Sequence, residues 1–224
     1  MKISLLSVLM ILMLLCSSEE KDIPDNFVNI KVAIPSIHLD IRYYGNHNFI
    51  GKPIDGYEAP KAYVTEETAM ALKNVQKELA DYNLGLLIYD AYRPQRAVNH
   101  FVRWAKKLED TLMKQEFYPD VKKENLFKED YIAARSGHSR GSTVDITLVD
   151  LKMGEPLDMG SNYDFFGRNS WPNYKGISKE QRAHRLLLQQ IMKENGFKPY
   201  AKEWWHFTLK TEPYPETYFD FVIQ

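Results

Sequence analysis

Two short segments in the second half of the chain carry side chains suited to binding a metal ion. The first runs from Ser136 to Asp145 and contains His138, and the second runs from Glu203 to His206. Two glycines in the first segment allow a turn that brings the imidazole and the carboxylate, seven residues apart, to one point. Two histidines and one carboxylate leave the fourth position of a tetrahedral zinc ion open, which is typical of catalytic sites.

A second carboxylate beside such a site suits a catalytic base. Zinc lowers the pKa of a bound water to about 7, and a nearby glutamate then takes the proton. Glu203 lies three positions before His206 and fits that task. Ordinary structural roles remain open for these residues: a histidine among aromatic residues often packs in a core, Asp145 can cap a turn, and Glu203 can pair with Lys202 or Arg185.

The cysteine content limits which ligands are available. Cys16 is the single cysteine, and it follows Lys2 and the apolar run at 3–15. This pattern, with small residues at 16–18, is typical of a secretory signal peptide. The run is shorter than the roughly 20 residues of a membrane span. We expect residues 1–18 to be a signal peptide, with lipid attachment at Cys16 as an alternative, and an exported protein in the periplasm or cell envelope.

The mature chain would then contain no cysteine, so disulfides and thiolate ligands are excluded and a metal must be held by His, Asp or Glu. The whole chain has 224 residues, 44% of them hydrophobic, and a formal net charge of -1. We expect residues 19–224 to form one domain. Because Lys and Arg are scattered among acidic residues, we expect no nucleic-acid partner, and membrane association only if Cys16 carries a lipid. The oligomeric state stays open.

The elements that must position the candidate site are expected to form an α+β fold. Alternating apolar residues predict a strand at 142–149 with Asp145 on its polar face. Further strands are expected at 28–34, 84–89 and 203–209, and the signals between 108 and 131 are weak.

We expect one helix with Thr65 as its N-cap, a second with Pro94 in its first turn, and a third after Ser178, which forms a capping box with Gln181. The mixture favours a single domain with a central, mainly antiparallel sheet flanked by helices, and with the zinc site at one face of the sheet.

The order of these motifs resembles the D-alanyl-D-alanine dipeptidases of the vancomycin-resistance type, which are related to D,D-carboxypeptidases and to the hedgehog zinc fold. The resemblance runs from about residue 37 to the C-terminus. Besides the two segments above, it rests on Asn48-Phe49-x-Gly51-Lys52-Pro53, Asp90-x-Tyr92-Arg93-Pro94, Met159-Gly160-Ser161-x-x-Asp164-Phe165 and Glu212-Pro213-Tyr214-Pro215.

The resemblance implies zinc-dependent hydrolysis of the small dipeptide D-Ala-D-Ala to two D-alanines. It implies one Zn²⁺ per chain, with His138, Asp145 and His206 as ligands and Glu203 as base.

The same resemblance assigns four further residues. Arg93 would steady the oxyanion, for which an ordinary salt bridge to Asp90 is the alternative. Tyr43 and Asp164 would bind the free amino group of the dipeptide, and Ser136 would contact the substrate.

Two other functions compete with this interpretation. One is a D,D-carboxypeptidase or endopeptidase acting on peptidoglycan; Tyr43 and Asp164 argue against it, because an anchor for an amino terminus is useless at an internal bond. The other is a zinc-bearing binding module without activity, which would need neither Glu203 nor Arg93. Family members that act on cytoplasmic dipeptide lack an export signal, whereas this chain has the pattern of one. We therefore expect a role in cell-wall peptide turnover rather than in antibiotic resistance.

Overall fold

The computed structural model describes residues 23–224, so the expected signal peptide and Cys16 lie outside it. Among the residues it describes, no helix is long and apolar enough to cross a membrane. The helices are α1 (Ile30–Ala33), η1 (Arg42–Tyr44), α2 (Glu66–Ala80), α3 (Gln95–Ala105), α4 (Lys114–Phe117), η2 (Lys123–Asn125), η3 (Gly137–Arg140), η4 (Arg168–Ser170) and α5 (Lys179–Glu194), where η denotes a 3-10 helix. The strands are β1 (Phe27–Asn29), β2 (His38–Leu39), β3 (Tyr63–Thr65), β4 (Leu84–Asp90), β5 (Thr143–Asp150), β6 (Phe197–Pro199) and β7 (His206–Leu209).

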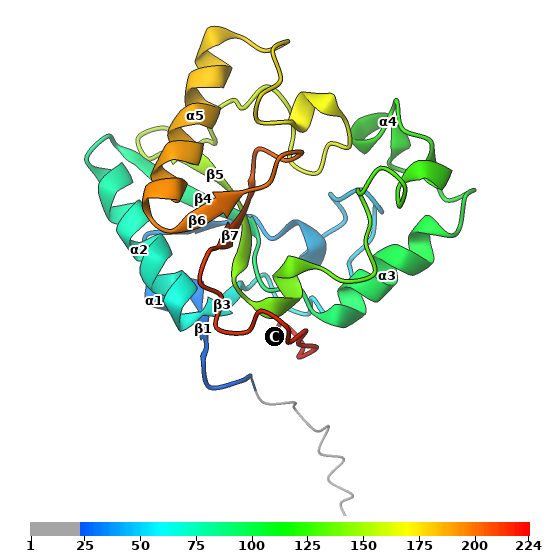
Figure 1. Ribbon diagram of the computed structural model, residues 1–224, viewed down its shortest axis with the longest axis horizontal. Coiled ribbons are helices and arrows are strands. Elements are labelled where there is room, and N and C mark those ends of the chain that lie inside the picture. Colours follow the sequence, from blue (N-terminus) through cyan, green and yellow to red (C-terminus); the bar gives the residue numbers. More distant parts are fainter. Residues whose placement is uncertain (1–22) are drawn as a thin grey trace, which may run out of the picture.

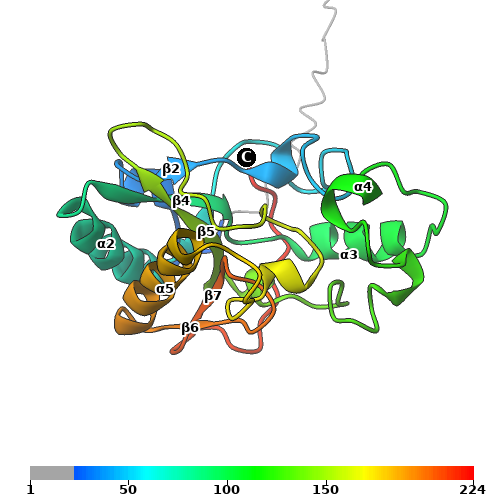
Figure 2. The same ribbon diagram turned by 90° about the horizontal axis from the view of Figure 1, so that it is seen from above.

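A five-stranded sheet in the order β2-β4-β5-β7-β6 forms the centre of the molecule. Its pairs are antiparallel except for β2 with β4, and β1 pairs with β3 in a separate two-stranded sheet. Figures 1 and 2 show α2 and α5 on one side of the sheet and α3 on the other. The helix predicted near Pro94 is present, with Pro94 as its N-cap and Gln95 as its first residue. The expected α+β fold with a mainly antiparallel sheet is confirmed.

The core follows the predicted periodicity. The apolar stripe of α2 and alternate residues of β5 have no exposed surface: Leu72, Val75, Leu79, Val144, Ile146 and Leu148. The polar face of β5 is buried as well, because Thr143 and Thr147 are fully buried and Asp145 is 2% exposed. A carboxylate is therefore held inside the protein at the middle of the sheet, and its charge must be compensated there.

The strand predicted at 28–34 is wrong in its second half. β1 ends at Asn29, and the chain turns into the short helix α1. The side chain of Asn29 accepts a hydrogen bond of 3.0 Å from the backbone N–H of Lys31, which caps that helix. A local cap therefore outweighs the β-branched composition of the segment.

The strand predicted at 203–209 begins only at His206. The residues before it form a turn, in which the backbone N–H of Trp204 donates to the carbonyl of Ser170 at 2.9 Å. Trp204 and Trp205 are both buried, at 4% and 1% exposure. Tertiary packing thus overrides the strand preference of the aromatic residues.

Two predicted helix starts differ in how they are capped. Ser178 and Gln181 form the expected capping box, with side-chain to backbone hydrogen bonds of 2.8 and 3.1 Å. Helix α2 begins after Thr65 as predicted, but the Thr65 hydroxyl does not cap the backbone. It instead lies 2.9 Å from the hydroxyl of Thr68 and 3.1 Å from that of Ser142, which ties the helix start to the chain before β5.

Gly141 ends η3 and should tolerate no side chain. Its φ of +81° is in the left-handed region, and an added Cβ would collide with the ring of Phe27. Gly154 has a similar φ of +74° but open space around the same position. Gly141→Ala should therefore lower the free energy of unfolding more than Gly154→Ala. Both share a conformational cost of about 1–2 kcal/mol, and only Gly141→Ala adds overpacking of about 1–3 kcal/mol. Urea denaturation measures both, and equal losses would contradict the packing argument.

Candidate active site

Three neighbouring strands bring the charged side chains of the site together. Asp145 on β5 pairs with His206 on β7 on one side and with Asp90 on β4 on the other. Residues directly opposite each other in paired strands point to the same face. The register of β4 shifts between Ile88 and Asp90, so that Asp90 rather than Tyr89 lies opposite Asp145.

His138 reaches the same point from the turn before β5. The hydroxyl of Ser136 accepts a hydrogen bond of 3.3 Å from the His138 backbone N–H, and Gly141 ends the turn in the left-handed conformation. The His138 Nδ1 lies 2.7 Å from the carbonyl oxygen of Ala91. Because a carbonyl can only accept, Nδ1 carries a proton, and the opposite ring nitrogen, Nε2, faces Asp145.

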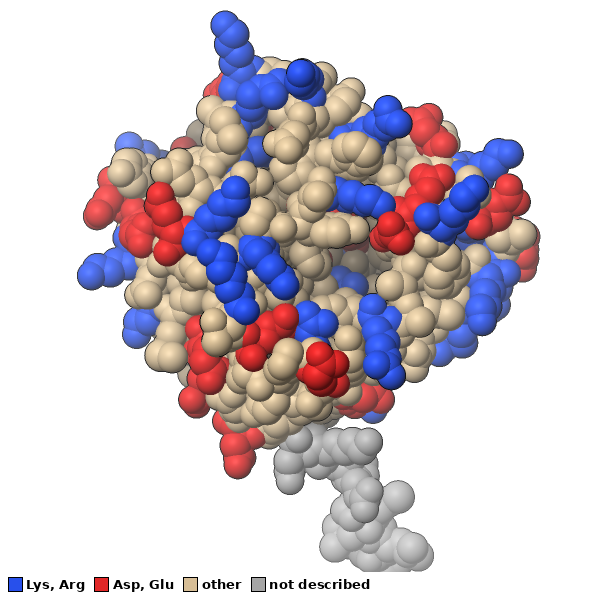
Figure 3. Space-filling model, in the orientation of Figure 1, with Lys and Arg blue, Asp and Glu red and all other residues tan. Residues whose placement is uncertain are grey.

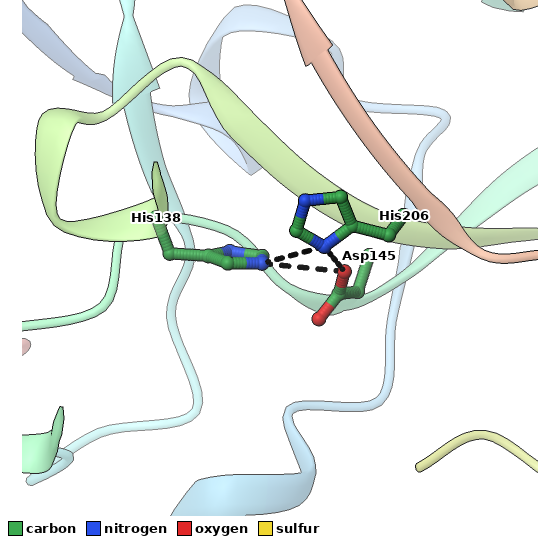
Figure 4. A group of neighbouring side chains, drawn as sticks. All are labelled: His138, Asp145 and His206. Atoms are coloured by element: carbon green, nitrogen blue, oxygen red, sulfur yellow. Dashed lines mark hydrogen bonds and ion pairs between the residues drawn. The ribbon is translucent and has the colours of Figure 1, made fainter. Parts of the chain in front are cut away.

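The side chains of His138, Asp145 and His206 point toward one another, as Figure 4 shows. Asp145 Oδ1 lies 3.3 Å from His138 Nε2 and 3.0 Å from His206 Nδ1, and the two nitrogens are 3.3 Å apart. Although Oδ1 is buried, it receives no hydrogen bond from any described residue. Two imidazole nitrogens and a buried carboxylate oxygen without a hydrogen bond form a donor set that fits zinc. These three residues can therefore hold a metal ion.

Glu203 and Asp145 lie in the same site but differ in their proton affinity. Burial raises the pKa of Asp145, but the imidazoles of His138 and His206 outweigh burial and hold this pKa below its ordinary value. Burial raises the pKa of Glu203 to about 7, although His206 opposes the shift. Glu203 Oε2 lies 3.4 Å from His206 Nδ1. One carboxylate is thus kept ionised, while the other is suited to exchange a proton near neutral pH.

Arg93 follows β4 and directs its guanidinium to the same place. Its Nε donates to Asp90 Oδ2 at 2.8 Å, and its Nη2 lies 3.5 Å from Asp145 Oδ2. The carbon of the guanidinium stands 5.0 Å from the ring centre of Tyr43. The salt bridge to Asp90, which the sequence left open as an alternative, is present, and it coexists with a position on the wall of the site.

Asp164 and Tyr43 form a second acidic centre. The Tyr43 hydroxyl donates to Asp164 Oδ2 at 2.8 Å, and no described residue forms an ion pair with Asp164. Asp164 is 6% exposed and has a φ of +58°, which is uncommon for a residue other than glycine. Burial, together with the charge of Asp145, raises the pKa of Asp164 well above its ordinary value. This carboxyl group would gain strongly from a cation placed beside it.

One cavity of about 320 Å³ is lined by all eight predicted site residues: Tyr43, Arg93, Ser136, His138, Asp145, Asp164, Glu203 and His206. The face drawn in Figure 3 is hollowed near its centre. A larger cavity of about 560 Å³ contains none of the eight. Residues that are distant in the sequence therefore meet in the smaller cavity, and this is where the chemistry of the chain is concentrated.

Tyr57 and Tyr163 were not identified from the sequence as residues of the site, and Asp90 was considered only as a salt-bridge partner of Arg93. The Tyr163 hydroxyl lies 3.1 Å from Asp145 Oδ2 and 3.2 Å from the Tyr43 hydroxyl. Tyr57 donates to Asp90 Oδ1 at 2.6 Å, so that Asp90 is held by Tyr57 on one oxygen and by Arg93 on the other. Tyr163 was within reach of the sequence, because it directly precedes Asp164 in one of the motifs; Tyr57 carried no such signal.

Comparison with known proteins gives the family. A family model described as Peptidase M15, D-ala-D-ala dipeptidase, matches residues 24–224. The chain belongs to this family. It is therefore an enzyme of the metallopeptidase class, and the resemblance drawn from the motifs is confirmed.

Curated relatives align with most of this chain and with nearly all of their own length. The D-alanyl-D-alanine dipeptidase of Enterococcus faecalis is 42% identical over 89% of this chain and 98% of its own. Those of Streptomyces coelicolor and Enterococcus faecium are 43% and 40% identical, each over 88% of this chain and 98% of their own. A crystal structure of the vancomycin-resistance D,D-pentapeptidase VanY with Zn(II) is more distant, at 12% identity over 70% of this chain and 78% of its own, with a TM-score of 0.40.

Removing any one of the three clustered side chains should abolish tight zinc binding. His138→Ala, Asp145→Ala and His206→Ala each leave only two protein ligands, whereas catalytic zinc sites use three. His184→Ala is the matched control, because this half-buried histidine lies outside the cavity and contacts the Asp158 carbonyl. Zinc content after dialysis, measured by mass spectrometry on folded protein, checks the assignment. Full zinc retention in all three variants would overturn it.

Proposed function

We propose that this chain hydrolyses D-Ala-D-Ala to two D-alanines, using one Zn²⁺ held by His138, Asp145 and His206. One observation carries the proposal: a metal-binding cluster, a carboxylate with a pKa of about 7 and an unpaired acidic group share one cavity of about 320 Å³. Relatives named D-alanyl-D-alanine dipeptidase, 40–43% identical over 98% of their own length, support the choice of substrate.

Hydrolysis would need both a Lewis acid, supplied by the ion, and a base, supplied by Glu203. When bound, zinc supplies a Lewis acid that lowers the pKa of water to about 7 and polarises the peptide carbonyl. Glu203 accepts the proton of the attacking water and returns it to the leaving amine. Burial raises the pKa of Glu203 above its ordinary value, which favours acceptance of the proton.

Arg93 is placed to stabilise the transition state. As water attacks, negative charge grows on the oxygen of the peptide carbonyl. The guanidinium of Arg93 is fixed by Asp90 at 2.8 Å and by the ring of Tyr43, so it need not reorganise when that charge appears. Such a preorganised donor typically contributes about 3–4 kcal/mol to the transition state.

Asp164 and Tyr43 select the substrate at its amino end. The free ammonium of a dipeptide would pair with Asp164, which has no other cationic partner within 23–224. Pairing with the ammonium would lower the pKa of this carboxyl group and offset the unfavourable free energy of burying its charge. A substrate whose amino group is already part of a longer chain would leave Asp164 buried without compensation. This preference for a free amino end favours a dipeptidase over a carboxypeptidase that acts on peptidoglycan.

We further propose that residues 1–18 export the protein and that it serves in turnover of cell-wall peptides in the envelope. This part of the proposal rests on the N-terminal sequence, in which a lysine and an apolar run precede small residues.

Glu203→Gln should keep the metal and lose at least about a hundredfold in kcat, the usual scale of acid–base catalysis. The amide has nearly the shape of the carboxylate but cannot accept the proton. Glu216→Gln makes the same change at an exposed position outside the cavity, and it should leave kcat unaltered. Steady-state hydrolysis of D-Ala-D-Ala, with zinc content determined in parallel, checks both variants. Near-normal kcat in zinc-loaded Glu203→Gln would show that another group takes the proton.

Acetylating the amino group of the dipeptide should lower kcat/KM at least ten- to a hundredfold. The modification removes the charge that pairs with Asp164 and leaves a buried acidic group without its partner, at a cost of about 1–3 kcal/mol. Asp164→Asn should narrow the gap, because it harms the free dipeptide more than the acetylated one. Equal cleavage of both substrates by the wild type would contradict the dipeptidase assignment and favour a carboxypeptidase, while the metal site would be unaffected.

A further inference from the structure

Arg135 is a cation of the active-site cavity that has no acidic partner among residues 23–224. Two arginines line this cavity, Arg93 and Arg135. Arg93 is engaged by Asp90 and Asp145. Arg135, in contrast, forms no ion pair and no hydrogen bond with any residue in 23–224. Its guanidinium carbon stands 5.0 Å from the ring centre of Tyr218, which is a contact with a neutral group.

The neighbouring charges are already matched with one another. Arg140 binds Glu212 through two hydrogen bonds of 2.7 and 2.8 Å. Lys202 pairs with Asp130, a cavity-lining carboxylate, at 2.9 Å. These two carboxylates already have cationic partners, and Arg135 has no ion pair within 23–224, so its guanidinium can meet an anion that enters the cavity.

The substrate brings such an anion. A free dipeptide carries an ammonium at one end and a carboxylate at the other. The cavity offers Asp164 to the ammonium, but the carboxylate must enter a space that is also lined by Asp130, Asp145 and Glu203. Zinc and Arg93 are assigned to the carbonyl of the scissile peptide bond, so a further cation is needed to receive the C-terminal carboxylate among these acidic groups.

We propose that Arg135 binds the C-terminal carboxylate of the dipeptide, so that the enzyme selects substrates with a free C-terminus. The inference rests on the proposed function. Arg135 directly precedes Ser136, whose hydroxyl caps the turn that carries His138, so the arginine is attached to the same rigid turn as a metal ligand. A planar guanidinium suits a carboxylate because it donates two parallel hydrogen bonds. The contact with the ring of Tyr218 limits the movement of the guanidinium, which belongs to a residue that lines the cavity.

Asp164 and Arg135 together would select substrates by length. Asp164 would bind the ammonium and Arg135 the carboxylate, so that only a dipeptide would occupy both positions. Arg135 then acts on substrate binding and specificity. Arg93 differs, because it is held beside Asp145, one of the metal-binding residues, and acts on the transition state.

The test compares D-Ala-D-Ala with its C-terminal amide, which lacks the negative charge. Arg135→Ala should raise KM for the free acid about tenfold, the scale of a lost charge-assisted hydrogen bond, with kcat changed by less than about twofold. The same substitution should change kcat/KM for the amide by less than about twofold, because the amide never engaged the guanidinium. Arg135→Lys keeps the charge but loses the planar fork, and it should restore part of the binding.

Arg168→Ala is the matched control. Arg168 is also exposed and also contacts an aromatic ring, that of Trp171 at 5.7 Å, but it lines a different cavity. It should leave KM for both substrates unchanged. The inference is overturned if Arg135→Ala affects the free acid and the amide equally, or affects neither. If the wild type hydrolyses neither substrate, the proposed function itself fails, which is a separate outcome.

Discussion

The buried carboxylate of Asp145 is the feature on which the rest of this structure depends. A charge at 2% exposure in the middle of a sheet is unfavourable unless it is compensated. On one side, Oδ2 is held by the hydroxyl of Tyr163 at 3.1 Å and approached by Arg93 at 3.5 Å. On the other side, Oδ1 faces the imidazoles of His138 and His206 without a hydrogen bond. The protein fixes one half of the carboxylate and leaves the other half available to a cation.

The surrounding elements follow from this arrangement. The paired register of β5 and β7 places His206 opposite Asp145, and the irregularity in β4 places Asp90 on the other side. The left-handed Gly141 returns the chain so that His138 faces the same point. Carboxyl groups within one cavity then take different roles because their partners differ: Asp145 is kept ionised, whereas burial raises the pKa values of Glu203 and Asp164.

Much of the fold could be predicted from local sequence. The strands at 84–90 and 143–150, the helix after Pro94 and the capping box at Ser178 all have signals within a few residues of themselves. The errors at 28–34 and 203–209 have a common cause. Each segment has a strand-like composition, but a hydrogen bond decides its backbone: the cap at Asn29 in one and the bond from Trp204 to Ser170 in the other. The second of these joins parts of the chain that sequence patterns do not connect.

The candidate site was predictable for a different reason. Residue types and spacing indicated a zinc site, and the resemblance to the family supplied Arg93, Tyr43 and Asp164, which the cavity brings together. Tyr57 was missed because its role depends on a contact with a residue distant in the sequence. Arg135 was missed because its role depends on the lack of such a partner. That Tyr57 holds Asp90, or that Arg135 has no partner within 23–224, is visible only once the chain is folded.

X-ray absorption spectroscopy of the zinc-loaded protein tests the central claim most directly. If Asp145, His138 and His206 hold the ion, the spectrum should show two imidazole nitrogens together with oxygen donors, at distances of about 2.0–2.2 Å. The imidazole rings should also add their characteristic scattering from atoms beyond the first shell. A first shell of oxygen alone, without imidazole scattering, would place the ion elsewhere and contradict the account.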